Sequence, residues 1–130
     1  MTKFRTEYDK FRGSPIRCVD MVHRQAFMVL FAPWNAKHWV LPWSRLEAFS
    51  ICPEGDAERI DLLFPNHHVV VVGENLRTVT DEIQEHEVVC MRNLPESHRA
   101  ALGSRAAFIS KLEVRVLADP KTHSADGIPY

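Results

Sequence analysis

The most regular alternation of apolar and polar positions lies near the end of the chain. One face of an extended segment there carries Phe108, Ser110, Leu112, Val114 and Val116, and the other face carries Lys111, Glu113 and Arg115. Side chains of a strand point alternately to its two faces, so a period of two residues is typical of a strand with one buried face. The pattern therefore predicts a strand of about ten residues whose apolar face packs into a core.

Three shorter strands are predicted in the middle of the chain. Residues 60–64 place Ile60, Leu62 and Phe64 on one face, which indicates a half-buried strand. After a tight turn, residues 68–72 read His-Val-Val-Val-Val, a run that a hairpin partner would bury on both faces. Residues 88–91 are apolar and rich in β-branched side chains, which predicts a short return to a sheet.

The first third of the chain also favours strands. Residues 15–32 are rich in Val, Met, Ile and Phe around a polar break at residues 23–25, which predicts two strands or one strand running into another. Residues 39–43 alternate, with both tryptophans of this stretch on one face. Pro42 has no amide hydrogen to donate, so it places this segment at a sheet edge or a bulge.

Helices are predicted in three places. Residues 3–12 carry an aromatic stripe of Phe4, Tyr8 and Phe11, which is typical of a short amphipathic helix. Residues 76–86 form the longest predicted helix, with Asn75 as its N-cap; Leu76, Val79 and Ile83 make its buried stripe, and Asp81, Glu82 and Glu85 face solvent. A short helix begins at Pro95, runs through Leu102 and is closed by Gly103.

Short turns between most of these strands favour antiparallel pairing, because a parallel pair needs a crossover of about a dozen residues or more. Only the connection through helix 76–86 is long enough for a parallel pair. We expect one α+β domain over residues 1–118, built on a curved, mostly antiparallel sheet or a small, partly open β-barrel. The helix at 76–86 would pack on one face or plug one end, with short helices flanking it. Residues 119–130 have no periodicity and are expected to form a frayed C-terminal tail.

Composition agrees with a globular domain and limits the function. The chain has 130 residues, of which 45% are hydrophobic and 25% charged, and its net charge of −1 excludes a strongly basic nucleic-acid binder. With no long apolar run and no secretory leader, we expect a cytoplasmic protein without membrane contact. Three widely separated cysteines, Cys18, Cys52 and Cys90, indicate reduced thiols rather than a disulfide framework.

Charge and aromatic residues are unevenly distributed. Residues 1–50 hold eight basic and four acidic residues, whereas residues 51–130 hold eight basic and thirteen acidic residues. The first 50 residues also contain nine of the chain's twelve aromatic residues, including every tryptophan. Tryptophan and arginine are frequent anchors of interfaces, so this part of the chain is where we expect a partner to bind.

The candidate binding residues are concentrated in one segment: Trp34, Lys37, His38, Trp39, Trp43 and Arg45. Three tryptophans in ten residues exceed what a small domain easily buries. The competing interpretation is that Trp39 and Trp43 fill the core, because they alternate with Leu41 on one face of a strand. Trp34 lies in a turn, and we expect it to be exposed.

Catalytic and metal-binding signals are weak. His86 and Cys90 have the spacing of a zinc-binding helix, but β-branched residues follow His86 and the two side chains would not share a helical face. His67 and His68 are neighbours on a strand and would point to opposite faces. The sequence contains no Gly-x-Ser-x-Gly elbow and no phosphate-binding glycine loop. We therefore expect no cofactor, and an enzyme is less favoured than a binding protein.

The leading hypothesis from the sequence is a non-catalytic cytoplasmic binding or assembly module, a homo-oligomer whose Trp- and Arg-rich segment forms the contact surface. The first alternative is a nucleic-acid-associated domain that uses Arg and Trp of residues 12–45. The second alternative is a small enzyme or metal protein that uses His38, His67 and His68.

Overall fold

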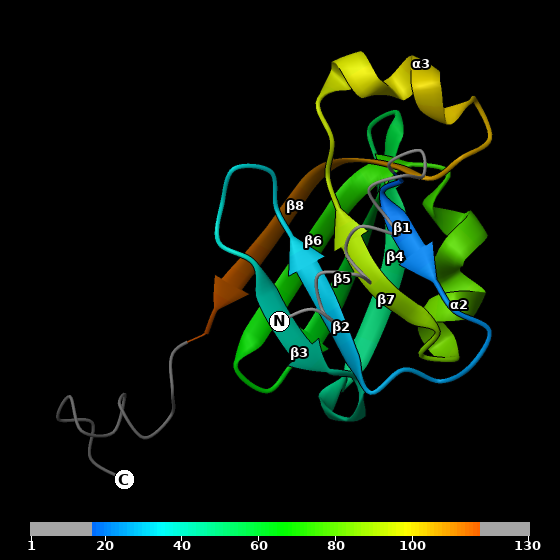
Figure 1. Ribbon diagram of the computed structural model, residues 1–130. Helices are drawn as coiled ribbons and strands as arrows, with labels where there is room; N and C mark the ends of the chain where they lie inside the picture. Colours follow the sequence, from blue (N-terminus) through cyan, green and yellow to red (C-terminus); the bar gives the residue numbers. More distant parts are fainter. Residues whose placement is uncertain (1–16, 118–130) are drawn as a thin grey trace, which may run out of the picture.

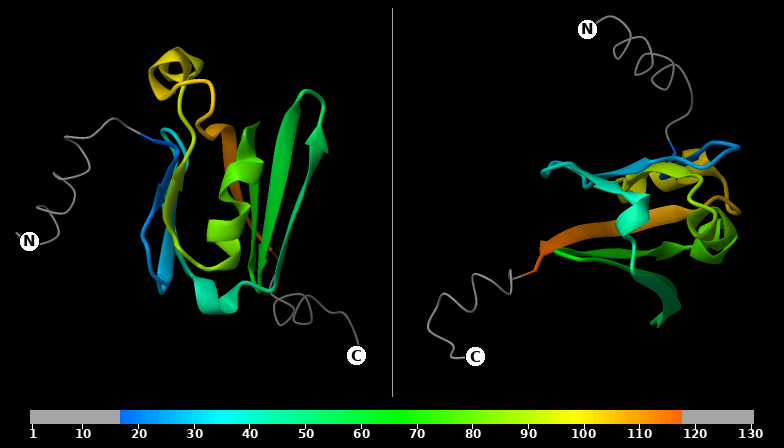
Figure 2. Two further views of the ribbon diagram at one scale, coloured as in Figure 1. Left: turned by 90° about the vertical axis from the view of Figure 1, so that its right-hand side faces the viewer. Right: turned by 90° about the horizontal axis from the view of Figure 1, so that it is seen from below.

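Two four-stranded sheets lie face to face in the computed structural model, which describes residues 17–117 (Figure 1 and Figure 2). The predicted helix at residues 3–12 and the predicted tail at residues 119–130 lie outside the described residues. We call the face of each sheet that meets the other sheet its inner face, and the opposite face its outer face. The inner faces build the core, as expected for two packed layers.

Sheet A has the strand order β1-β7-β2-β3. Its strands are β1 (Val19–Met21), β2 (Met28–Ala32), β3 (Trp39–Pro42) and β7 (Val88–Arg92). β1 pairs antiparallel with β7 and β2 antiparallel with β3, but β2 and β7 are parallel. β3 is therefore an edge strand, which confirms the edge position that Pro42 predicts.

Sheet B has the order β4-β5-β6-β8, and all its pairs are antiparallel. Its strands are β4 (Ala48–Glu54), β5 (Ala57–Phe64), β6 (His67–Glu74) and β8 (Phe108–Val116). β5, β6 and β8 coincide with predicted strands. β4 was not predicted, because residues 48–54 carry a proline and only two large apolar side chains, Phe49 and Ile51, on their inner face.

The helical segments are short. They are the 3₁₀ turns η1 (Trp43–Arg45), η2 (Leu76–Val79) and η3 (Glu96–His98), and the α-helices α2 (Thr80–Gln84) and α3 (Arg99–Leu102). Figure 2 shows α2 at one open edge of the two layers, and α3 beyond one end of them. None of the helices in residues 17–117 is long and apolar enough to cross a membrane.

The core lies between the sheets. From sheet A, Val29, Phe31 and Met91 are fully buried, and from sheet B so are Ile60 and Val71. The predicted stripe of the middle helical segment closes the open edge: Leu76, Val79 and Ile83 are all buried in the same cluster. This stripe is confirmed, because apolar side chains at three- and four-residue spacing reach the same side of a helical turn.

The sequence favours a single sheet or a partly open barrel, whereas residues 17–117 form two separate sheets with mostly antiparallel pairs and no closed barrel. The one parallel pair also differs from the expectation. β7 follows α2 but does not pair with β6, the strand before that helix; instead β7 lies between β1 and β2. An alternating pattern tells which face of a strand is buried but not which strand lies beside it, so the sequence alone leaves this open.

The predicted helix at 76–86 is shorter and divided into η2 and α2. Asn75 does not cap it: its backbone is left-handed, with φ of 59°, and no side-chain capping bond forms. The Asn75 side-chain amide instead donates hydrogen bonds to the backbone oxygens of Ser104 (2.8 Å) and Ala106 (3.2 Å). The cap residue is thus used to hold the segment that leads into β8.

The predicted faces of β8 are correct only in part. Phe108 and Leu112 are buried and Val114 is half-buried, as predicted. Ser110 and Val116, also predicted on the buried face, are exposed, and Ile109 is buried instead. The register shifts opposite Val72 and Gly73, where β8 carries one additional residue. A β-bulge of this kind moves the following side chains to the other face, which a strict two-residue alternation does not anticipate.

Gly73 explains why the bulge fits. A Cβ atom on Gly73 would collide with the backbone of Phe108 and Ile109. The two strands therefore approach more closely here than any other residue would allow, as is typical of glycine inside a strand. The predicted strand at residues 68–72 stops before Gly73, whereas β6 continues to Glu74.

Candidate functional site

The three tryptophans of the candidate binding segment lie in three different environments. Trp34 is 49% exposed, Trp39 is half-buried and Trp43 is 1% exposed. Lys37 and His38, which precede β3, and Arg45, which follows it, are exposed. β3 runs between these two groups, so its length separates Lys37 from Arg45. The segment is therefore not one continuous surface of aromatic and basic side chains.

Trp43 is a core residue. Its indole Nε1 donates a hydrogen bond to the backbone oxygen of Val88 (2.8 Å), and its ring stacks on His86 at 5.3 Å between ring centres. A buried indole N–H needs such a partner, because an unpaired buried donor is costly. Trp43 is therefore not available to a partner and cannot be one of the residues that bind it.

Trp39 closes one end of the space between the sheets. The Lys37 ammonium lies 4.4 Å from the centre of the Trp39 ring, and the ring of His67 from β6 meets it edge-on at 5.2 Å. One face and one edge of the indole are thus occupied by the chain's own side chains. A base of a nucleic acid would have to displace Lys37 to stack on this face.

Trp34 is the one exposed tryptophan. Its backbone N–H donates to the Asn93 side-chain oxygen (2.7 Å), and its ring lies 6.0 Å from the ring of His98. The exposure of Trp34 agrees with its predicted place in a turn. These contacts tie the β2–β3 loop to the segment that follows β7.

The outer face of sheet A is apolar where β2 and β3 meet. Met28 lies opposite Pro42 and Leu30 opposite Val40, and the residues between them point into the core. Met28 and Val40 are 44% and 55% exposed, and Phe27, just before β2, is 90% exposed. We call Met28, Leu30, Val40 and Pro42 the outer patch; it consists of two neighbouring cross-strand pairs of uncharged side chains.

The outer face of sheet B is charged instead. Arg59 donates two hydrogen bonds to the Asp61 carboxylate (3.0 and 2.9 Å), and Asp61 is also hydrogen-bonded to His68 Nε2 (2.7 Å). These bonds, that of Arg59 above all, hold the pKa of Asp61 below its usual value. Lys111, Glu113 and Arg115 of β8 continue this face. Such a face is well solvated and needs no partner.

Two of the three thiols are buried. Cys90 in β7 receives a hydrogen bond from Arg92 (3.0 Å), and Arg92 also bonds to the Asp20 carboxylate (2.8 Å). Burial raises the pKa of Cys90 to about 11 and also raises that of Cys18, so both thiols stay protonated at neutral pH. A protonated buried thiol is a poor nucleophile. The arrangement therefore gives no support to thiol catalysis.

The histidines of the metal hypothesis are not brought together. His67 faces Trp39 between the sheets, whereas His68 bonds to Asp61 on the outer face of sheet B. His86 stacks on Trp43 and Cys90 lies in β7, so this pair does not form a helical metal site either. Within residues 17–117, no three His, Cys, Asp or Glu side chains are grouped in a way that could hold a metal ion.

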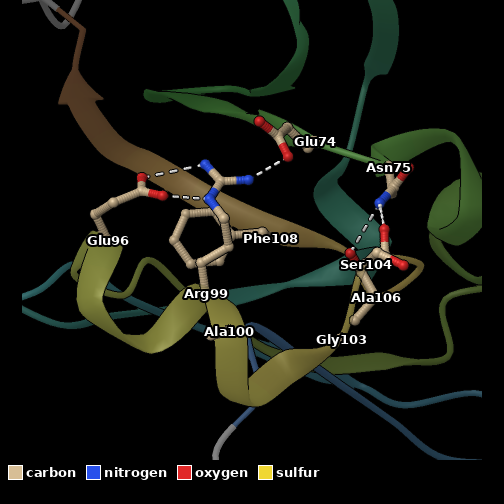
Figure 3. A pocket seen from close by; sticks show the side chains of 9 residues that line it. All are labelled: Glu74, Asn75, Glu96, Arg99, Ala100, Gly103, Ser104, Ala106 and Phe108. Atoms are coloured by element: carbon tan, nitrogen blue, oxygen red, sulfur yellow. Dashed lines mark hydrogen bonds and ion pairs between the residues drawn. The ribbon is translucent and has the colours of Figure 1, made fainter.

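A cavity of about 460 Å³ lies between the end of β6, α3 and the start of β8 (Figure 3). Arg99 is held there by the carboxylates of Glu74 and Glu96, and its guanidinium lies over the Phe108 ring at 4.3 Å. One guanidinium thus pairs with two carboxylates, and Figure 3 shows Arg99 directed at both of them. The charged side chains of this cavity are therefore accounted for by ion pairs within the chain, which are common on protein surfaces.

The outer patch is not among the residues predicted to bind a partner, although the sequence contains a signal for it. β2 reads Met-Val-Leu-Phe-Ala and β3 reads Trp-Val-Leu-Pro, so both strands are apolar on both faces. Strands of this composition are typical of sheets that are covered on both sides. Within residues 17–117, no element packs over the outer patch enough to bury Met28 or Val40.

Comparison with known proteins gives no guide to the function. No protein-family model, curated protein or solved structure that was compared with this chain matches it.

Proposed function

We propose that the chain is a non-catalytic binding module that associates with a second copy of itself through the outer patch of sheet A. One observation carries the proposal: Met28, Leu30, Val40 and Pro42 form a continuous uncharged surface on a sheet whose inner face is already in the core. Burying apolar surface contributes about 25 cal/mol per Å² removed from water. Covering this patch is thus favourable, whereas covering the charged outer face of sheet B is not.

The exposure of single apolar side chains is ordinary in folded proteins, but a contiguous patch is not. Phe27, just before β2, is 90% exposed and adds a large aromatic side chain to the exposed apolar residues at this end of β2. Large aromatic side chains at the border of an apolar surface are common anchors of protein interfaces.

A second copy is the partner that fits an uncharged patch best. In a twofold dimer the same surface meets itself, so any charge on it would face a like charge. The outer patch contains none. β3, which carries Val40 and Pro42, is also an edge strand, and edge strands are commonly covered by another chain. A copy seated on the patch would cover both features.

Nucleic acid fits this surface less well. Binding to a phosphate backbone needs several basic side chains along one surface. Here Lys37 and Arg45 lie at opposite ends of β3, and the face of Trp39 is occupied by Lys37. Lys37, Trp39 and Arg45 therefore do not form one contiguous surface that would support the alternative of a nucleic-acid-associated domain.

Sedimentation equilibrium on the full chain tests the proposal. We expect a dimer that dissociates on dilution and persists at about 0.5 M salt, because screening weakens charge contacts but not apolar ones. Val40→Glu should shift the equilibrium to monomer. Leu63→Glu is the matched control, since Leu63 is 39% exposed on the outer face of sheet B.

Two results would overturn the proposal: a wild type that is monomeric at every concentration, or a dimer that Leu63→Glu disrupts as strongly as Val40→Glu. Trp34→Ala measures how far the contact extends toward the β2–β3 loop. A desolvated interface tryptophan costs at least about 2 kcal/mol when truncated, whereas an incidental surface tryptophan costs nearly nothing.

A further inference from the structure

A second cavity, of about 540 Å³, is lined by residues of β1, of η2, of the end of α3 and of the segment after α3. Its volume is within the range of about 300–1,000 Å³ that is usual for small-molecule sites. This cavity differs chemically from the cavity around Arg99, because its described lining contains no carboxylate.

Apolar side chains from three elements make the walls. They come from β1, from η2 and from the end of α3, namely Val19, Met21, Val79 and Leu102, together with Ala101, Ala106 and Ala107. Met21 is 46% exposed at the end of β1, so an apolar side chain stands at the mouth of the cavity. Ligand sites are usually lined in this way, with a few polar groups that orient the ligand.

The charged groups of the lining are all positive. Arg17 and Arg105 line the cavity and are both exposed, and neither forms an ion pair with another residue in the part of the chain that the structure describes. The remaining polar groups are neutral. The Thr78 hydroxyl donates to the backbone oxygen of Asn75 (2.6 Å), and the Cys18 thiol accepts from the Ile109 N–H (3.2 Å).

We propose that this cavity binds a small amphipathic carboxylate, with its apolar tail against Val19, Val79 and Leu102 and its carboxylate between Arg17 and Arg105. Guanidinium groups bind carboxylates through paired, charge-assisted hydrogen bonds, and two arginines in the lining of an otherwise apolar cavity favour an anionic head over a neutral or cationic one. Burial keeps the Cys18 thiol protonated by raising its pKa, so the floor adds no negative charge that would repel the ligand.

The site is separate from the outer patch. It opens beside β1, whereas the patch lies on β2 and β3, and β7 stands between them in sheet A. A ligand here would therefore leave the proposed dimer contact free. The inference stands or falls independently of the proposed self-association.

The experiment is an amide NMR titration of the full chain with three probes of equal tail length: octanoate, octanol and octylammonium. We expect octanoate to shift the amide signals of Thr78, Leu102, Arg105 and Ala107, and to bind at least about tenfold more tightly than octylammonium, as two charge-assisted contacts imply. Arg105→Gln should weaken octanoate binding about tenfold. The matched control Arg45→Gln, an exposed arginine in η1, should leave it unchanged.

Val40→Glu separates this site from the outer patch, because it should abolish self-association and leave the octanoate shifts in place. Three results would overturn the inference. They are no saturable shift with octanoate, equal binding of octanoate and octylammonium, and shifts confined to the amides of β2 and β3. The last result would mean that octanoate merely coats the outer patch.

Discussion

The indole of Trp43 donates its hydrogen bond to Val88, a residue 45 positions later in the chain, and so fastens the end of β3 to the start of β7. β3 and β7 are not neighbours in sheet A, since β2 lies between them. The bond therefore crosses the width of β2 at the end of the sheet. Trp43, which directly follows β3, thus serves the fold, while outward-facing residues of β2 and β3 form the outer patch.

Trp43→Phe should destabilise the chain by about 3 kcal/mol, because it removes indole packing and leaves the buried Val88 oxygen without its donor. Trp34→Phe should change the free energy of unfolding by less than about 0.5 kcal/mol, since Trp34 is exposed and bonds through its backbone. Urea unfolding of both variants checks the prediction. Equal costs would mean that Trp43 is not the buried anchor described here.

The bulge in β8 can be tested by substituting two adjacent residues. Ile109→Ala should cost about 3 kcal/mol, because Ile109 is fully buried and leaves a cavity. Ser110→Ala should cost less than about 1 kcal/mol, since it removes only an exposed hydrogen bond to the Val72 oxygen. The strict alternation of the sequence predicts the reverse order, so urea unfolding decides between the two registers.

Much of the local structure follows from the sequence. The strands β5, β6, β7 and β8, the stripe of Leu76, Val79 and Ile83, and the exposed turn at Trp34 all follow from periodicity and turn chemistry, which depend on neighbouring residues. Pairing does not. Leu30 lies beside Cys90 in the parallel pair of β2 and β7, and nothing in the sequence around either residue specifies the other.

The outer patch was not predicted from the sequence, for a related reason. The sequence predicts an interface of tryptophan and arginine side chains. In the structure Trp43 is buried in the core, and the Lys37 ammonium lies over the ring of Trp39. Side chains with no special chemistry, Met28 and Val40, become prominent only when pairing places them side by side on an uncovered face. The sequence pattern shows that both faces of β2 are apolar. Only the three-dimensional structure shows which of the two faces is not covered by another element.

The stability of the chain should depend on pH through Asp61. The folded state holds the pKa of Asp61 below its usual value of about 4, so the stabilisation is complete at neutral pH and is lost as the pH falls through the folded-state pKa. Asp61→Asn should therefore be less stable than wild type at pH 7 and should approach wild type in acid.

Thermal unfolding across this pH range measures the difference for Asp61→Asn, with Glu47→Gln, an exposed carboxylate before β4, as the control. A difference between wild type and Asp61→Asn that grows in acid would contradict the role given to Arg59 and His68.

The three thiols should react very differently with iodoacetamide. Cys52 is exposed, whereas Cys18 and Cys90 are buried, and burial raises the pKa of Cys90 to about 11. Mass spectrometry of the native chain should therefore find the label on Cys52 first, and on all three thiols only after denaturation. Labelling of Cys90 at the rate of Cys52 would show that β7 opens in the native state.

The most direct test of the outer patch is an isotope-filtered NOE measurement on a mixture of labelled and unlabelled chains, which detects only contacts between copies. The proposed dimer predicts intermolecular NOEs to the methyl groups of Met28, Leu30 and Val40, because these side chains meet their counterparts across the contact. Leu63, on the outer face of sheet B, should show none. Intermolecular NOEs at Leu63 but not at Val40, or none at any methyl group at concentrations where the chain is dimeric, would contradict the account.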